Sequence, residues 1–101
     1  MIIELKKFGT VLTSRNDGKE AYNAIQILLK NLKEKEELII DFNDVYAFSP
    51  SWGDEFLTNL YKKYKDRLVL LNTKNPSVIA TLDMLTEINN INFTIKKSLK
   101  N

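Results

Sequence analysis

The 101-residue chain has 44% hydrophobic and 28% charged residues, values typical of one globular domain, and no stretch of its sequence resembles a linker. It has no cysteine and no histidine, which excludes disulfides, thiolate nucleophiles, zinc sites of the Cys/His kind and imidazole acid–base catalysis. The net charge of +2 does not favour a nucleic-acid partner, and no signal-peptide pattern or membrane-spanning apolar run is present, so we expect a cytoplasmic protein that binds no membrane.

The first third of the chain predicts two strands and a helix. The segments "IIELKKF" and "TVLT" are short and rich in β-branched residues, and Gly9 between them predicts a tight turn that joins two strands. From Ser14 the apolar residues recur at helical spacing, which predicts an amphipathic helix from Ser14 to about Lys33. Ser14 is a suitable N-cap, and Asp17 three residues later can complete a capping box.

The rest of the chain alternates between strand and helix patterns. The run "ELIIDF" predicts a strand buried on both faces, and "EFLTNLYKKYK" predicts a second helix. "RLVLLN" predicts another buried strand, "NPSVIATLDMLTEI" a third helix capped by Asn75 or Ser77, and "INFTIKK" a closing strand. We expect the domain to span residues 1–97 and the tail at 98–101 to fray.

The predicted order of elements is β-β-α-β-α-β-α-β, which places the chain in the α/β class. Strands that are separated by helices need crossover connections, and these are nearly always right-handed. The last three strands should therefore run parallel in one sheet. We expect a single domain with a mixed, mostly parallel sheet and packed helices.

Two common kinds of α/β active site are absent. The three glycines, Gly9, Gly18 and Gly53, cannot form a dinucleotide-binding or P-loop motif. A serine hydrolase site also fails, because there is no G-x-S-x-G motif and no histidine to act as the base. We therefore expect a protein without enzymatic activity or a cofactor.

Four carboxylates form the next candidate site. Asp41 and Asp44 flank the end of the central strand, and Asp54 and Glu55 are predicted in the first turn of the next helix. Because α/β folds bind ligands at the carboxyl ends of their strands, we expect these acids at the functional edge of the sheet. Asp54 and Glu55 can also stabilise a helix start through its dipole, by about 0.3–1 kcal/mol each. Helix capping, partner contact and catalysis, by an acid pair or a magnesium site, thus remain alternative roles for these acids.

The segment "AFSPSWGDEF" allows two assignments of the helix start. With Ser49 as N-cap, Pro50 takes the first helical position and Ser51 has a spare hydroxyl. With Ser51 as N-cap, Asp54 completes a capping box. Either way one serine is structural, and a phosphate on the other would meet free N–H groups at the positive end of a helix. Ser51 and Ser49 are therefore both candidates for phosphorylation.

Two further residues complete the candidate surface. Arg15 follows the first helix cap, where it is either solvated or able to hold an anion. Trp52 is either a core residue or, if its ring is exposed, an anchor for an interface. The partner-binding candidates are Ser14, Arg15, Trp52, Asp54 and Glu55, beside the two serines.

Charge is distributed unevenly between the two halves of the chain. Residues 1–55 carry seven Lys/Arg and ten Asp/Glu, whereas residues 56–101 carry eight and three. The basic excess lies in "YKKYKDR" and "IKKSLK", which form either a solvated helix end and terminus or a surface for an acidic partner. A homo-oligomer that joins the basic end of one copy to the acidic half of another is a further alternative.

Three motifs, taken in order, resemble a known family. "FGTVLTSR", "DFNDV…SWGDEFL" and "NTKNPSVIATLDM" are similar to motifs of the bacterial STAS-like domain of unknown function, over roughly residues 2 to 95. The run "IIDFNDVYAFSPSWGDEFLTNL" also resembles the strand, loop and helix of STAS domains (sulfate transporter and anti-sigma factor antagonist). In this chain Ser49, Pro50 and Trp52 replace the acid, the first serine and the glycine that STAS domains usually have there.

The resemblance implies a compact α/β fold that acts by binding rather than by catalysis. In anti-sigma factor antagonists a partner kinase phosphorylates a serine at the start of the second helix, and alignment on Asp41 and Val45 places Ser51 on that serine. The implied partner is a histidine-kinase-type ATPase or an anti-sigma-like kinase. We therefore expect a regulatory interaction module, and the alternative is a domain that binds a small ligand or nucleotide at the same edge of the sheet.

Overall fold

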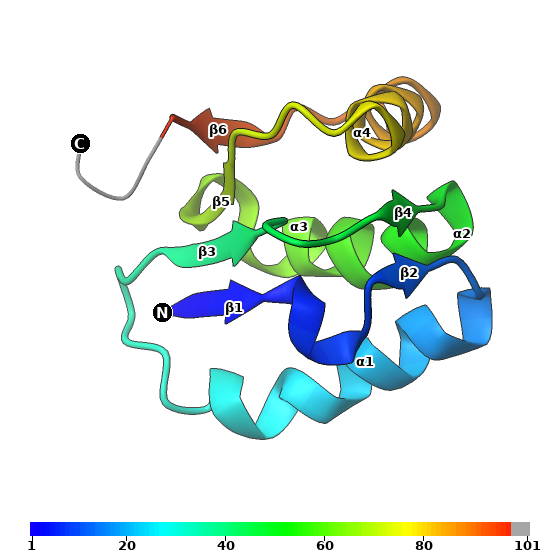
Figure 1. Cartoon of the computed structure of the whole chain (residues 1–101). Helices are drawn as coiled ribbons and strands as arrows, with labels where there is room; N and C mark the ends of the chain where they lie inside the picture. The colour runs from blue at the N-terminus through cyan, green and yellow to red at the C-terminus, as the bar shows by residue number, and fades with distance from the viewer. Residues whose placement is uncertain (98–101) are drawn as a thin grey trace.

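The computed structural model describes residues 1–97, and the predicted tail at 98–101 lies outside the described residues (Figure 1). The α/β class is confirmed. The elements in chain order are β1 (Ile2–Glu4), the 3₁₀ helix η1 (Leu5–Phe8), β2 (Val11–Leu12), α1 (Arg15–Leu29), β3 (Leu38–Asp41), β4 (Ala47–Phe48), α2 (Pro50–Gly53), the π-helical turn η2 (Asp54–Thr58), α3 (Asn59–Tyr64), the 3₁₀ helix η3 (Lys65–Arg67), β5 (Leu68–Leu71), α4 (Pro76–Asn89) and β6 (Thr94–Lys96).

The described strands form two parallel sheets. The larger sheet has the order β1-β3-β5-β6, with Ile3 opposite Ile40 and Leu70 opposite Ile95. The prediction that the last three predicted strands, now β3, β5 and β6, run parallel in one sheet is confirmed. Every strand pair within residues 1–97 is parallel, so the expectation of a mixed sheet is wrong.

The predicted hairpin at the start of the chain is also wrong. β1 ends at Glu4, and the chain then turns through η1, so that β2 pairs with β4 in a separate two-stranded sheet. The physical reason is that Leu5 and Phe8, three residues apart, fall on one side of a 3₁₀ turn. Leu5 is completely buried there, and Phe8 packs on Phe56 with ring centroids 5.7 Å apart. The sequence reading also missed β4.

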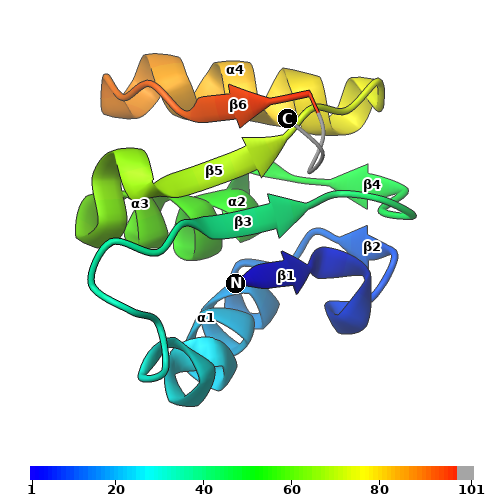
Figure 2. The same cartoon turned by 90° about the vertical axis from the view of Figure 1, so that its left-hand side faces the viewer.

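All helices that connect the strands of the large sheet lie on one face of that sheet (Figure 2). The strand order advances in a single direction, and successive right-handed crossovers then return on the same side. β3 consequently alternates, with Leu38 and Ile40 fully buried against the helices and Ile39 and Asp41 partly exposed, so the expectation that both its faces are buried is wrong. β5 lies between β3 and β6, and Leu68, Val69 and Leu70 are all fully buried, as expected.

Helix boundaries follow local capping. α1 starts after Ser14, as predicted, but ends at Leu29 rather than Lys33. α4 starts after Asn75, whose side-chain oxygen accepts hydrogen bonds from the N–H groups of Ser77 and Val78, which decides between the two predicted caps. No helix within residues 1–97 has the length and apolar character needed to cross a bilayer.

The second helical segment runs without a break from Pro50 to Tyr64 but contains one π-helical turn, η2. A π turn places one extra residue in the helix and is rare outside functional or strained positions. Thr58, at its end, is 2% exposed, and its hydroxyl has no hydrogen-bond partner in the described structure. No sequence signal indicates this turn.

An aromatic cluster fills the core between α1, α2 and β4. Trp52 packs on Phe56 and Phe48, with ring centroids 4.8 and 5.7 Å apart. α1 reaches this cluster because Gly18 has no side chain: a Cβ there would lie 2.7 Å from the carbonyl oxygen of Trp52. The close contact of α1 with α2 brings the starts of both helices to the same part of the surface.

Candidate functional site

The start of α1 fixes the positions of Ser14 and Arg15, two of the predicted site residues. The hydroxyl of Ser14 accepts a hydrogen bond from the backbone N–H of Asp17 at 3.0 Å, which confirms the predicted cap. Arg15, the first helical residue, is therefore held at the exposed end of α1, and its guanidinium reaches the neighbouring helical segment.

The two serines at the start of α2, Ser49 and Ser51, have different roles. Ser49 is the N-cap: its hydroxyl accepts from the N–H of Trp52 at 3.2 Å and donates to the carbonyl oxygen of Thr13 at 2.7 Å. Pro50 takes the first helical position, so the first of the two predicted assignments is confirmed. Ser51 is partly exposed, and its hydroxyl makes no hydrogen bond to the rest of residues 1–97. Ser49 thus has a structural role, and Ser51 has the spare hydroxyl.

Arg15 joins the two helix starts through a pair of carboxylates. Its Nη1 lies 2.7 Å from an oxygen of Glu55 and 3.3 Å from an oxygen of Asp54. Hydrogen bonds to Glu55, and then to Asp54, raise the pKa of Arg15, which stays cationic. Because Ser49 is the cap, both acids lie beyond the first turn of α2, and the expectation that they act as first-turn helix stabilisers is wrong.

A hollow of about 190 Å³ lies beside these groups. Arg15, Ser51 and Asp54 line one part of it, and the C-terminal half of α4 lines the other. α4 contributes Leu85, Ile88 and Asn89, residues that sequence reasoning missed as site residues. Ile88 is 70% exposed, which the helical pattern alone does not reveal, because it depends on where α4 packs. We call the residues that line this hollow the α1–α2–α4 surface; they are Arg15, Pro50, Ser51, Asp54, Leu85, Ile88 and Asn89.

Trp52 does not belong to this surface. It is 1% exposed and packs between Phe8, Phe48 and Phe56. Of the two predicted roles, the core role is therefore confirmed, and the place of Trp52 among the partner-binding candidates is wrong. The reason is the position of the cap: with Ser49 at the N-cap, the third helical residue turns toward the sheet.

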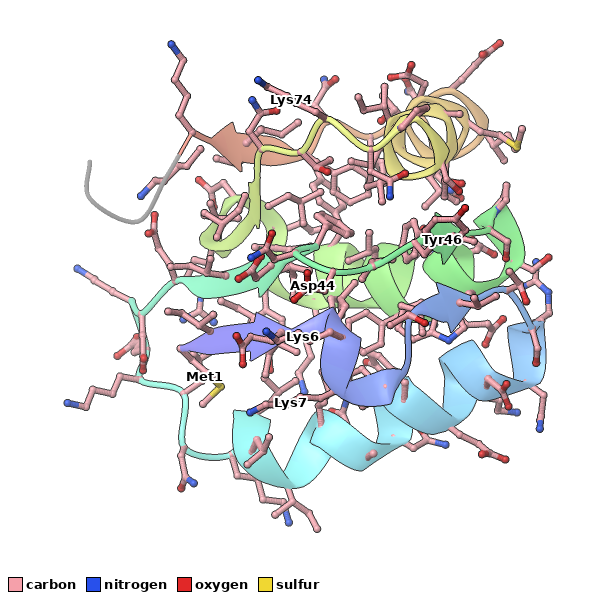
Figure 3. The ribbon with its side chains drawn as sticks, viewed as in Figure 1. Met1, Lys6, Lys7, Asp44, Tyr46 and Lys74 are labelled. Atoms are coloured by element: carbon pink, nitrogen blue, oxygen red, sulfur yellow. The ribbon has the colours of Figure 1, made fainter. Side chains whose placement is uncertain are left out.

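The four acids do not gather at one edge. Asp41 accepts a hydrogen bond from the backbone N–H of Asn43 at 2.9 Å. Asp44 pairs with Lys6 at 3.4 Å, and Figure 3 shows these two side chains close together. Neither residue lines the α1–α2–α4 surface. Residues 1–97 contain no group of three or more acidic side chains placed to hold a metal ion. The carboxylates are thus divided between two places.

The structure is a small α/β module with parallel sheets. Its candidate site lies where the starts of α1 and α2 meet. A family model described as a STAS-like domain of unknown function matches residues 25–78, more than half of the chain, and the chain belongs to this family. The match is shorter than the expected span of residues 2–95: it includes "DFNDV…SWGDEFL" but begins after "FGTVLTSR". Comparisons with curated proteins and with solved structures found no match.

Proposed function

We propose that the chain is a non-enzymatic regulatory module that binds a protein partner through the α1–α2–α4 surface. The observation that carries this proposal is the combination of an exposed apolar side chain, Ile88, with an ion-paired Arg15 and a spare hydroxyl at Ser51 around one hollow. Protein interfaces commonly combine a central apolar anchor with polar groups at the rim. Ile88 is the anchor in this proposal.

The size of the hollow supports a protein partner over a small ligand. Pockets for small molecules usually measure about 300–1,000 Å³ and enclose most of the ligand. The hollow beside Ser51 measures about 190 Å³. A nucleotide at this place would remain largely in solvent, whereas a side chain of a partner would fill it.

The proposal includes a switch at Ser51. A phosphate on its hydroxyl would add up to two negative charges to a hollow that Arg15 and Asp54 also line. It would compete with Asp54 for Arg15 and would repel that carboxylate. The ion pair that joins the two helix starts would rearrange, and partner binding would change with it. The proposed partner is a kinase-type ATPase that both binds the surface and supplies the phosphate.

Matched surface variants test the interaction. Ile88→Glu should abolish capture of a kinase-type ATPase from the native cell extract, identified by mass spectrometry and then confirmed with the purified ATPase by calorimetry. Ile27→Glu is the control, because Ile27 is 74% exposed on α1 and lines none of the hollows described. The proposal fails if no such ATPase is enriched, or if Ile88→Glu binds the purified ATPase as the unmodified chain does.

Intact-mass measurement tests the switch separately. Incubation with the captured ATPase and ATP should add one phosphate to the unmodified chain and none to Ser51→Ala. An added phosphate on Ser51→Ala would assign the modification to another residue. Full binding without any phosphate would retain the interaction and remove the switch.

A further inference from the structure

A second and larger hollow lies between β2 and the N-terminal half of α1. Its volume is about 480 Å³, within the range of occupied binding sites, and it shares no lining residue with the α1–α2–α4 surface. Phe8 and Trp52 are among its apolar lining residues, and Val11 of β2 and Asp17 and Glu20 of α1 also line it. Figure 1 shows β2 beside the N-terminal half of α1.

β2 has one unpaired edge. Within residues 1–97 it pairs only with β4, and the carbonyl oxygens of Thr10 and Leu12 accept hydrogen bonds from the N–H groups of Tyr46 and Ser49 at 2.7 and 2.9 Å. Successive residues of a strand direct their backbone polar groups to opposite edges. The N–H and C=O of Val11 therefore point away from β4, and its side chain is 60% exposed. An unpaired edge of this kind accepts a further strand.

The opposite wall of the hollow is acidic. Asp17 and Glu20 are three residues apart on α1, which puts their side chains on neighbouring positions of one helix face. Both are exposed, and neither forms an ion pair with a lysine or arginine of residues 1–97. Lys19, the nearest cation in the sequence, forms no ion pair with either acid within residues 1–97, and Arg15 is bound by Asp54 and Glu55. The wall therefore carries two negative charges that a cationic side chain would complement.

We propose that this hollow binds an extended basic segment of a partner protein, which adds a parallel or antiparallel strand to the free edge of β2. Main-chain hydrogen bonds to Val11 hold the segment, and one lysine or arginine side chain reaches Asp17 and Glu20. Alternate side chains of an extended segment point to the same side, so the residues that flank the cation point away from the hollow. The segment binds independently of the α1–α2–α4 surface.

A defined peptide tests the proposal. The probe is the acetylated, amidated peptide Thr-Val-Thr-Lys-Thr-Val-Thr, and its matched control has glutamate in place of lysine. In a titration followed by amide NMR, the lysine peptide should shift the signals of Val11, Asp17 and Glu20 and slow hydrogen exchange at Val11. It should also change the fluorescence of Trp52, the single tryptophan. No shift at these residues up to about 1 mM peptide, or equal binding of the glutamate peptide, would overturn the proposal.

Variants separate the charge from the backbone contacts. The double variant Asp17→Asn, Glu20→Gln should weaken the binding of the lysine peptide about tenfold or more, whereas Asp66→Asn, at an exposed acid in η3, should leave the affinity unchanged. Thermal melting checks that each variant is folded. A probe methylated on its backbone nitrogens should not bind, because it cannot pair with Val11.

Other occupants give distinct results. Equal binding of the methylated probe, or displacement of the lysine peptide by spermidine at the same affinity, would show a site for small cations and overturn strand addition. A concentration-dependent dimer in sedimentation that protects Val11 without any peptide would assign the edge to a second copy and also overturn the proposal.

Discussion

Gly18 of α1 lies against the backbone of Trp52 in α2, and a Cβ at this position would be 2.7 Å from the carbonyl oxygen and 2.9 Å from the Cα of Trp52. This contact brings the two helix starts together and so positions Arg15 near Asp54 and Glu55. Alanine is the better helix former by up to about 1 kcal/mol, but a clash with backbone atoms cannot be relieved by a side-chain rotation.

Gly18→Ala should therefore lower the free energy of unfolding, by about 1–3 kcal/mol, which is typical of overpacking. Urea denaturation measures it. Lys19→Ala, at the exposed neighbouring position, is the control and should change stability by less than about 0.5 kcal/mol. A stabilised Gly18→Ala protein would show that the two helices are further apart than described.

The two serines at the start of α2 should respond differently to the same substitution. Ser49→Ala removes the N-cap and the hydrogen bond to Thr13, and should cost about 1–2 kcal/mol of stability. Ser51→Ala removes a hydroxyl that has no hydrogen-bond partner within residues 1–97, and its stability should stay within about 0.5 kcal/mol of that of the unmodified chain. Equal costs would mean that both serines take part in capping.

Two buried threonines form a matched pair. Thr58→Val replaces a buried hydroxyl that has no partner and should raise the free energy of unfolding by about 1 kcal/mol. Thr81→Val, also buried, removes the hydrogen bond to the carbonyl oxygen of Phe48 (2.5 Å) and should lower it by about 1–3 kcal/mol. Chemical denaturation of both variants measures whether the free energy of unfolding rises or falls in each. A destabilised Thr58→Val protein would indicate a partner for this hydroxyl, such as a bound water.

Asn75 has two separable roles at the start of α4. Its oxygen caps the helix, and its amide nitrogen donates to the carbonyl oxygens of Val45 (2.8 Å) and Tyr46 (3.2 Å). Asn75→Asp keeps the cap and loses the donor, whereas Asn75→Ala loses both. We expect a loss of about 1–2 kcal/mol for alanine and a smaller loss for aspartate, with faster amide exchange around Val45 in both variants. Equal losses would show that the cap contributes little.

The free energy of unfolding should depend on the ionisation of Glu36 at acidic pH. The backbone N–H of Lys33, and next the amino group of Met1, hold the pKa of Glu36 below its ordinary value. A carboxylate with a lowered pKa stabilises the folded state above its ordinary pKa, and this contribution is lost as the pH falls through the lowered value.

The urea midpoint of Glu36→Gln should therefore depend less on pH across that acidic window than the midpoint of the unmodified chain. Glu34→Gln is the matched control, because the side chain of Glu34 has no ion-pair partner within residues 1–97. Identical pH profiles for the unmodified chain and Glu36→Gln would contradict the prediction.

The sequence alone determined the class of the fold and most of its helices. Apolar periodicity and capping residues are local, so α1, α4, β3 and β5 could be recognised from short windows. The α/β order then required parallel pairing of β3, β5 and β6. The candidate site at "SPSWGDEF" was found for the same reason, because a serine, a proline and two acids mark a helix start.

Only the tertiary structure decided which side chains this region exposes. The choice between Ser49 and Ser51 depended on the carbonyl of Thr13, and the pairing of Asp54 and Glu55 depended on Arg15. Ile88 became a site residue, and Trp52 a core residue, through the packing of distant elements. These contacts join residues more than 30 positions apart, and no local pattern records such distances.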